Sequence, residues 1–167
     1  MMRRGQEELY KVLDNLSIQY RYYEHPPLAT IEEARIHWKD YDSGRCKNIF
    51  FRNHKGNKHY LVILEHLRQL DIHDLEKRLK QGKLTFASDK RLMTYLGVEP
   101  GSVSPFGLIN DKEKNVHLFI DEKLKEYENL AFHPNVNTAT LVISRPDLLR
   151  FLDYTGTSYE FIRLYDD

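Results

Sequence analysis

The chain has 167 residues, of which 41% are hydrophobic and 30% charged, an ordinary composition for a soluble globular domain. Its 25 basic and 25 acidic side chains cancel, so the overall charge gives no support for a nucleic-acid partner, which would need a local basic surface. The one cysteine, Cys46, excludes a disulfide within the chain and argues against a cysteine-based zinc site. We expect one cytoplasmic domain over residues 1–167, because no apolar run has membrane-spanning length and no signal-like core follows the first residues.

Helices and strands are predicted along the whole chain. In chain order they are a helix over 6–17, a strand over 18–24, a helix over 31–38, strands over 47–53 and 58–65, a helix over 71–80 closed by Gly82, a strand over 84–86, a helix over 88–96, a loop passing into a strand over 103–108, a strand over 116–121, a helical turn over 124–127, a strand over 138–144, a helix from 145 that Gly156 ends, and a strand over 159–164. The elements have no strict βαβ rhythm, which favours an α+β fold with a mixed sheet.

Three separate features suit ester chemistry on a polyanionic substrate. Lys47 lies inside a predicted strand, where a lysine is uncommon and costly to bury. The loop from Gly101 to Gly107 could turn its backbone amides toward a ligand. His133 lies in the segment Phe132-His133-Pro134-Asn135. A fixed cation, backbone donors and an imidazole could together hold an ester and stabilise an oxyanion.

Each of these features also has an ordinary structural explanation. A lysine protects an exposed sheet edge from aggregation, a loop of this composition can be a plain turn, and a lone histidine is more often a structural hydrogen-bonder. The loop lacks the G-x-S-x-G pattern, so we expect no serine nucleophile. Cys46 should face away from Lys47 as a structural thiol, and the histidines show no metal-binding spacing. We therefore expect neither a metal nor a cofactor.

Taken together, several segments resemble the YbaK/ProX family of aminoacyl-tRNA editing domains, and more closely its free-standing ProXp-ala or PrdX-like branch, which removes alanine wrongly attached to proline tRNA. The matching segments are His25-Pro26-Pro27, Lys47 to Phe50, Gly82 to Phe86, Leu96 to Leu108 and Phe132 to Pro134. The resemblance runs from about residue 7 to residue 152. It implies a mixed, barrel-like β-sheet flanked by helices.

The resemblance also implies roles for individual residues. Lys47, Gly101 and His133 would be catalytic; Asn48, Thr30, Ser102, Ser104, Pro105 and Phe106 would bind the substrate; Arg52 and Lys83 would contact the tRNA acceptor stem. Lys77, Arg78 and Lys80 add positive charge near Lys83 and could also meet stem phosphates, or form a solvated face balanced by nearby acids. Water, helped by the ribose hydroxyl of the tRNA, would be the nucleophile.

The implied function is a trans-editing hydrolase that cleaves the ester of mischarged tRNA, foremost Ala-tRNA(Pro). The aminoacylation site of a synthetase that is shaped for proline rejects a smaller amino acid by only about 1–3 kcal/mol per missing methylene. A second, smaller site is therefore needed to hydrolyse the wrong product. Two alternatives stay open, a deacylase for Cys- or Ser-tRNA and a non-catalytic tRNA- or synthetase-associated module. Prolyl-tRNA synthetase is a further partner that the resemblance allows.

Overall fold

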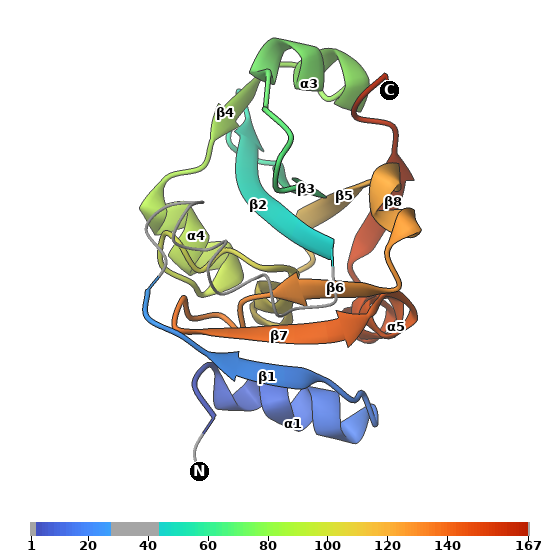
Figure 1. Cartoon of the computed structure of the whole chain (residues 1–167). Helices are drawn as coiled ribbons and strands as arrows, with labels where there is room; N and C mark the ends of the chain where they lie inside the picture. The colour runs from blue at the N-terminus through green and yellow to red at the C-terminus, as the bar shows by residue number, and fades with distance from the viewer. Residues whose placement is uncertain (1–2, 28–43, 167) are drawn as a thin grey trace.

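The computed structural model describes residues 3–27 and 44–166, which are built around one eight-stranded sheet (Figure 1). The strands are β1 (Arg21–Glu24), β2 (Gly44–Asn53), β3 (His59–Glu65), β4 (Leu84–Phe86), β5 (Val116–Asp121), β6 (Asn129–Phe132), β7 (Ala139–Ser144) and β8 (Ser158–Ile162). The helices are α1 (Glu7–Asn15), α3 (Ile72–Leu79), α4 (Asp89–Leu96) and α5 (Arg145–Thr155), with 3-10 helices η1 (Pro105–Asn110) and η2 (Glu122–Glu126). Within these ranges no helix is long and apolar enough to cross a membrane.

The sheet is mixed, as the sequence predicts for an α+β fold. Its strands follow the order β1-β7-β6-β2-β3-β5-β8, and β4 pairs with β2 outside this path. The pairs β2–β6, β3–β5 and β5–β8 are parallel, whereas β1–β7, β6–β7, β2–β3 and β2–β4 are antiparallel. In Figure 1, β1, β7 and β6 form a lower layer, and β2 rises from it toward α3.

The two edges of β2 are paired differently. Along one edge β3 pairs with residues 46–52. On the other edge β6 pairs only with Gly44 and Arg45, and β4 pairs only with residues 51–53. Between them, the one described backbone contact is a hydrogen bond from the Ala87 amide to the Phe50 carbonyl. We call residues 46–49 the open edge of β2, since no described strand pairs with them on this side.

Alternation along β2 and β3 divides the core into two clusters. Phe50, Leu61 and Ile63 face the larger cluster, which contains the apolar sides of α1, α4 and α5. Phe51, Val62 and Leu64 face the smaller cluster with Leu75 and Leu79 of α3, among others. Adjacent residues of β2 therefore point into different surroundings, which decides where its polar side chains lie.

Most predicted elements are confirmed within a few residues, and the exceptions have local causes. Residues 103–108 were predicted as a loop passing into a strand, and the strand is wrong. Residues from Pro105 form η1, because Ser104 Oγ accepts the Phe106 amide and the proline ring fixes a helical φ. Helix α3 ends at Lys80, which takes the left-handed conformation (φ 57°), before Gly82 is reached. The short strand β6 was not predicted. The helix predicted over 31–38 lies outside the described residues.

Candidate active site

A small cavity opens where β2 and β6 stop pairing. Its volume is about 40 Å³, enough for a few water molecules or a methyl-sized group. The lining side chains come from three strands and are Arg45, Cys46, Asn48, Ala131, Phe132, His133 and Thr140. The sequence therefore folds so that the open edge of β2 and the end of β6 bring Asn48 and His133, two of the predicted site residues, to one cavity.

His133 lies directly after β6, with its imidazole held by the backbone. Its Nδ1 is 2.8 Å from the Ala139 carbonyl oxygen, which can only accept a hydrogen bond, so Nδ1 donates and Nε2 is left as an acceptor. Burial lowers the pKa of His133; the bond to Ala139 opposes this shift, and the nearby His25, whose ring centroid is 5.8 Å away, adds to it. The imidazole is therefore neutral at pH 7 and can accept a hydrogen bond from water or from a substrate.

His25 and Thr140 fix the wall of the cavity behind His133. His25 Nδ1 donates to the Pro26 carbonyl oxygen at 2.9 Å, and His25 Nε2 accepts from the Thr140 hydroxyl at 2.7 Å. Both residues were missed as site residues by the sequence analysis. The His25-Pro26-Pro27 segment was the available signal, because it belongs to the matching pattern without having been given a role.

Asn48 brings an unsatisfied acceptor to the cavity. Its Oδ1 atom is buried and has no hydrogen-bond partner in the described part of the chain. Leaving a buried acceptor unpaired costs about 1–3 kcal/mol, so such atoms are uncommon unless a ligand or water pairs with them. A donor group of a bound substrate would remove this cost.

Cys46 also lines the cavity but is a poor nucleophile. Burial raises the pKa of its thiol, and the carboxylates of Glu65 and Asp121 act in the same direction. The group therefore stays protonated at neutral pH, and its side chain packs against the larger core cluster. This agrees with the expectation of a structural thiol facing away from Lys47.

Lys47 lies at the same open edge but leaves β2 on the opposite face from Asn48. It shares that face with Ile49, which packs against the smaller core cluster. Its Nζ donates to the Arg68 carbonyl oxygen at 2.7 Å, and no other partner of this ammonium lies among the described residues. Two N–H groups thus remain for a ligand, on the opposite face of β2 from the cavity that Asn48 lines.

The Gly101 loop lies against the connection between β6 and β7 that follows His133. Gly101 has a φ of 88°, and a methyl group added to it would come 3.6 Å from Asn137 Nδ2. The amides of Ser102, Phe106 and Gly107 are used inside the loop, by the Glu99 carbonyl, Ser104 Oγ and the Ser104 carbonyl. No acceptor for the amides of Gly101, Val103 and Ser104 is found within the described ranges.

The other predicted substrate-binding residues serve mainly to shape the loop and the core. Ser104 is fully buried as the cap of η1, Pro105 is its first residue, and Ser102 is buried beside them. Phe106 is fully buried and packs edge-on against Phe132, a cavity-lining residue, with ring centroids 5.9 Å apart. Thr30 lies outside the described residues.

The three predicted catalytic residues are thus gathered in one region without all lining one cavity. His133 lines the cavity, and the Gly101 loop packs beside the segment that follows it. Lys47 reaches the open edge from the other face. The alternation of β2 accounts for this split, since Lys47 and Asn48 are adjacent in the chain. No group of three His, Cys, Asp or Glu residues in the described part of the chain is placed to hold a metal ion.

A basic surface lies between the β2–β3 turn and the turn before β4. It surrounds a hollow of about 410 Å³ lined by Asn53, His54, Lys55, Asn57, Lys58, Gln81, Gly82 and Lys83. The Arg52 guanidinium donates to the carbonyls of Asn53 and His54, which braces the turn. No described carboxylate lines this hollow, and Glu76, which shares the neighbouring groove with Lys83, is the acidic residue close to it.

The positive charge predicted around α3 is weaker than the sequence suggests. Arg78 forms ion pairs with Asp74 and Asp166, each at 2.8 Å, so its charge is already matched. Lys83 belongs to the basic surface, where the other cations are Lys55 and Lys58 of the hairpin turn and not residues of α3. The predicted cluster of Lys77, Arg78, Lys80 and Lys83 is therefore not the main basic feature of this end.

Known proteins resemble this chain over most of its length. The model of the aminoacyl-tRNA editing domain family matches residues 25–151. A protein named prolyl-tRNA editing protein ProX, from Acetoanaerobium sticklandii, is 39% identical over 155 residues, covering 91% of this chain and 93% of that protein. The prolyl-tRNA synthetase associated domain-containing protein 1 of Danio rerio is 34% identical, covering 89% of this chain and 82% of that protein.

Solved structures share the fold at low sequence identity. One, described as a candidate trans-editing enzyme for prolyl tRNA synthetase, has a TM-score of 0.69 at 20% identity and covers 96% of this chain and 99% of its own. Another, hypothetical protein APE2540, has a TM-score of 0.71 at 18% identity, with coverages of 93% and 99%. With the mixed sheet and the family match, these findings establish the class: the chain belongs to the aminoacyl-tRNA editing domain family. The resemblance seen in the sequence is confirmed.

Proposed function

We propose that this chain hydrolyses the ester bond of mischarged aminoacyl-tRNA in trans, with Ala-tRNA(Pro) as its substrate. The observation that carries the proposal is the small cavity in which the unpaired Asn48 Oδ1 and the neutral His133 meet. Family membership and the name of the ProX relative support the same reaction class.

The chemistry asks little of the protein because an aminoacyl ester is already reactive. Water attacks the carbonyl carbon, and the ester breaks when the ribose 3′ oxygen leaves with a proton, giving a free amino acid and tRNA. His133 Nε2, an acceptor, orients the water. Asn48 Oδ1 accepts from the substrate ammonium. The Lys47 ammonium, on the other face of β2, supplies donors for ribose or phosphate oxygens, and the amides of the Gly101 loop supply donors for the oxyanion.

The size of the cavity supports alanine over proline as the acyl group. A volume of about 40 Å³ admits a methyl side chain, and the three methylenes of a proline side chain would fill more of it. Forcing extra methylenes into a closely packed site typically costs about 1–3 kcal/mol. A cavity of this kind would select by size: it would admit and hydrolyse the alanyl ester that the proline site of the synthetase fails to reject.

Deacylation assays with Ala-tRNA(Pro), Pro-tRNA(Pro), Cys-tRNA and Ser-tRNA test the proposal. We expect hydrolysis of Ala-tRNA(Pro) to be about 100-fold faster than that of Pro-tRNA(Pro), corresponding to roughly 3 kcal/mol of discrimination. A preference for the Cys or Ser ester would support the same deacylation reaction with a different amino acid as the substrate. Equal rates on Ala and Pro esters, or tRNA binding without any hydrolysis, would reject the proposal. Adding prolyl-tRNA synthetase to the same assay tests whether that enzyme is a partner.

The basic surface is proposed to bind phosphates of the acceptor stem. Replacing Lys58 and Lys83 together by alanine is expected to raise KM for aminoacyl-tRNA and leave kcat unchanged. The slope of log KM against log salt should fall by about 1 to 2, because each neutralised phosphate contributes roughly 0.7–0.9.

A matched control removes two lysines elsewhere. Lys11 and Lys123 are partly exposed and each pairs weakly with a glutamate on its own helix. The double variant Lys11→Ala/Lys123→Ala should keep the wild-type salt slope. Equal loss of slope in both double variants would mean that general charge, not this surface, attracts the tRNA.

A further inference from the structure

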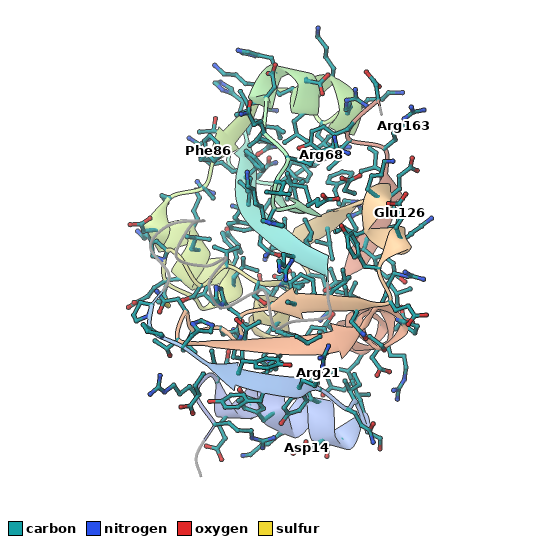
Figure 2. All side chains as sticks on the ribbon, in the orientation of Figure 1. Asp14, Arg21, Arg68, Phe86, Glu126 and Arg163 are labelled. Carbon is teal, nitrogen blue, oxygen red and sulfur yellow. The ribbon has the colours of Figure 1, made fainter. Side chains whose placement is uncertain are left out.

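Phe86 is an exposed aromatic residue at the end of the edge strand β4. It is 57% exposed, although Leu84 of the same strand is buried. Its register partner is Phe51, and the two ring centroids are 5.0 Å apart. The fully buried Phe51 therefore supports one side of the Phe86 ring while much of the ring remains open to solvent. Figure 2 shows Phe86 at the outer edge of the molecule, beside β4.

A groove with an apolar floor leads to this ring. It lies between α3 and β4, has a volume of about 650 Å³, and is lined by Ile72, His73, Glu76, Lys77, Gly82, Lys83 and Leu84. Leu84 and Phe86 alternate onto the same face of β4, so Phe86 extends the floor of the groove. Glu76, the one carboxylate in the lining, already accepts the Leu84 amide at 2.7 Å, and this bond lowers its pKa. Lys77 and Lys83 are the cations of the lining.

Phe86 lies between the basic surface and the candidate active site. Lys83 belongs to both the basic surface and the groove. Along β2, Phe51, the register partner of Phe86, lies four residues from Lys47, which is about 13 Å at strand spacing. A strand of RNA that follows the β4 side of β2 away from the basic surface would therefore cross Phe86 before it reaches the open edge of β2.

We propose that Phe86 is a stacking platform for an unpaired base that precedes the terminal adenosine at the 3′ end of the tRNA, with Lys83 and Lys77 holding the neighbouring phosphates. Single-stranded RNA is bound in this way, by aromatic faces on which bases stack and by cations that follow the backbone. The inference rests on the proposed function, which it deepens by assigning the path of the substrate. It gives Phe86 a role in binding and none in the bond-breaking step.

The first test compares two substrates that differ in the unpaired nucleotides. For Ala-tRNA(Pro), Phe86→Ala is expected to raise KM about 10-fold or more, since loss of one stacked base typically weakens binding by roughly 5- to 150-fold. For 3′-O-alanyl-adenosine, which lacks the preceding nucleotides, the same variant should behave as wild type. Phe86→Trp should retain binding of the tRNA, whereas Phe86→Leu, apolar but not planar, should resemble Phe86→Ala.

The matched control is Tyr154→Ala, which removes an aromatic residue of equal exposure, 56%, from α5. This variant should leave KM unchanged for both Ala-tRNA(Pro) and alanyl-adenosine. A second readout needs no catalysis: the affinity for an uncharged RNA hairpin with a single-stranded 3′ overhang should fall in Phe86→Ala, and that for the same hairpin with a blunt end should not.

Several results would overturn the inference. Equal losses on Ala-tRNA(Pro) and alanyl-adenosine would make Phe86 a support of the cavity and not a base platform. Unchanged KM and unchanged overhang affinity, in a wild-type protein that does deacylate, would remove the inference and leave the proposed function standing. A wild-type protein that hydrolyses neither substrate would instead reject the proposed function itself.

Discussion

Replacing Lys47 with alanine is expected to lower kcat for Ala-tRNA(Pro) deacylation by about 100-fold or more, with little change in the fold. Lys47 lies on the face of β2 opposite the cavity, so we expect it to position the ribose or phosphate oxygens, and misplacing a substrate by about 1 Å can cost about 100-fold in rate. Lys47 is the cation at the open edge of β2, and its ammonium retains two donors beyond the bond to the Arg68 carbonyl. Losing that single bond should reduce stability by only about 1 kcal/mol. Single-turnover kinetics, with circular dichroism and urea unfolding, measure both quantities.

Two further variants separate the charge of Lys47 from its position. Lys47→Arg keeps the charge with a different donor geometry and should recover part of the activity. Lys11→Ala removes an exposed lysine of α1 and should have no effect on turnover. If Lys47→Ala deacylates at the wild-type rate, Lys47 is an edge-protecting lysine and has no part in the chemistry.

Replacing Asn48 with leucine is expected to change activity and stability in opposite directions. The substitution removes an amide that leaves a buried oxygen unpaired, which costs about 1–3 kcal/mol in the free protein. Leucine has a similar shape and no polar atom, so the free energy of unfolding should stay equal or rise by about 1 kcal/mol. Deacylation should fall about 100-fold, because the acceptor for the substrate ammonium is gone.

The decisive comparison for Asn48 is urea unfolding with and without a non-hydrolysable alanyl-adenosine analogue. The analogue should stabilise the wild-type protein and have little effect on Asn48→Leu. Asn135 offers a contrast, since its Oδ1 is also buried and unpaired but lies outside the cavity lining, whereas its Nδ2 donates to Gln6 Oε1 and its φ is 65°. Asn135→Leu should therefore lose stability and keep the response to the analogue. A large loss of stability in Asn48→Leu, together with unchanged turnover, would contradict a role in substrate binding.

The fold class was predictable from the sequence because its helices and most strands have strong local signals. Ser88 and Ser144 cap α4 and α5 through their hydroxyl groups, and Gly97 and Gly156 end these helices in left-handed conformations. Such signals depend on a few neighbouring residues. The pairing of β2 with β6 and β4 depends on contacts far apart in the chain, and the local sequence does not report them.

The candidate site was predictable in its members but not in its arrangement. The resemblance gave Asn48 and His133, and the structure brings both to one cavity. That meeting depends on β6, a four-residue strand whose sequence has too few alternating positions to be recognised. The separation of Lys47 from Asn48 follows from alternation, a rule that the sequence analysis applied to Cys46 but not to Asn48. Thr30 remains a prediction.

The gap in the pairing of β2 has a consequence for how this protein could be altered. Access to the cavity depends on β4 being short and β6 leaving after residue 45. Extending β4 along residues 46–49 would complete the hydrogen-bond ladder of β2, add rigidity and cover this edge. Pairing this edge of β2 would therefore stabilise the sheet at the expense of activity. Substitutions meant to stabilise the protein should be made in its helices and turns rather than in this part of its sheet.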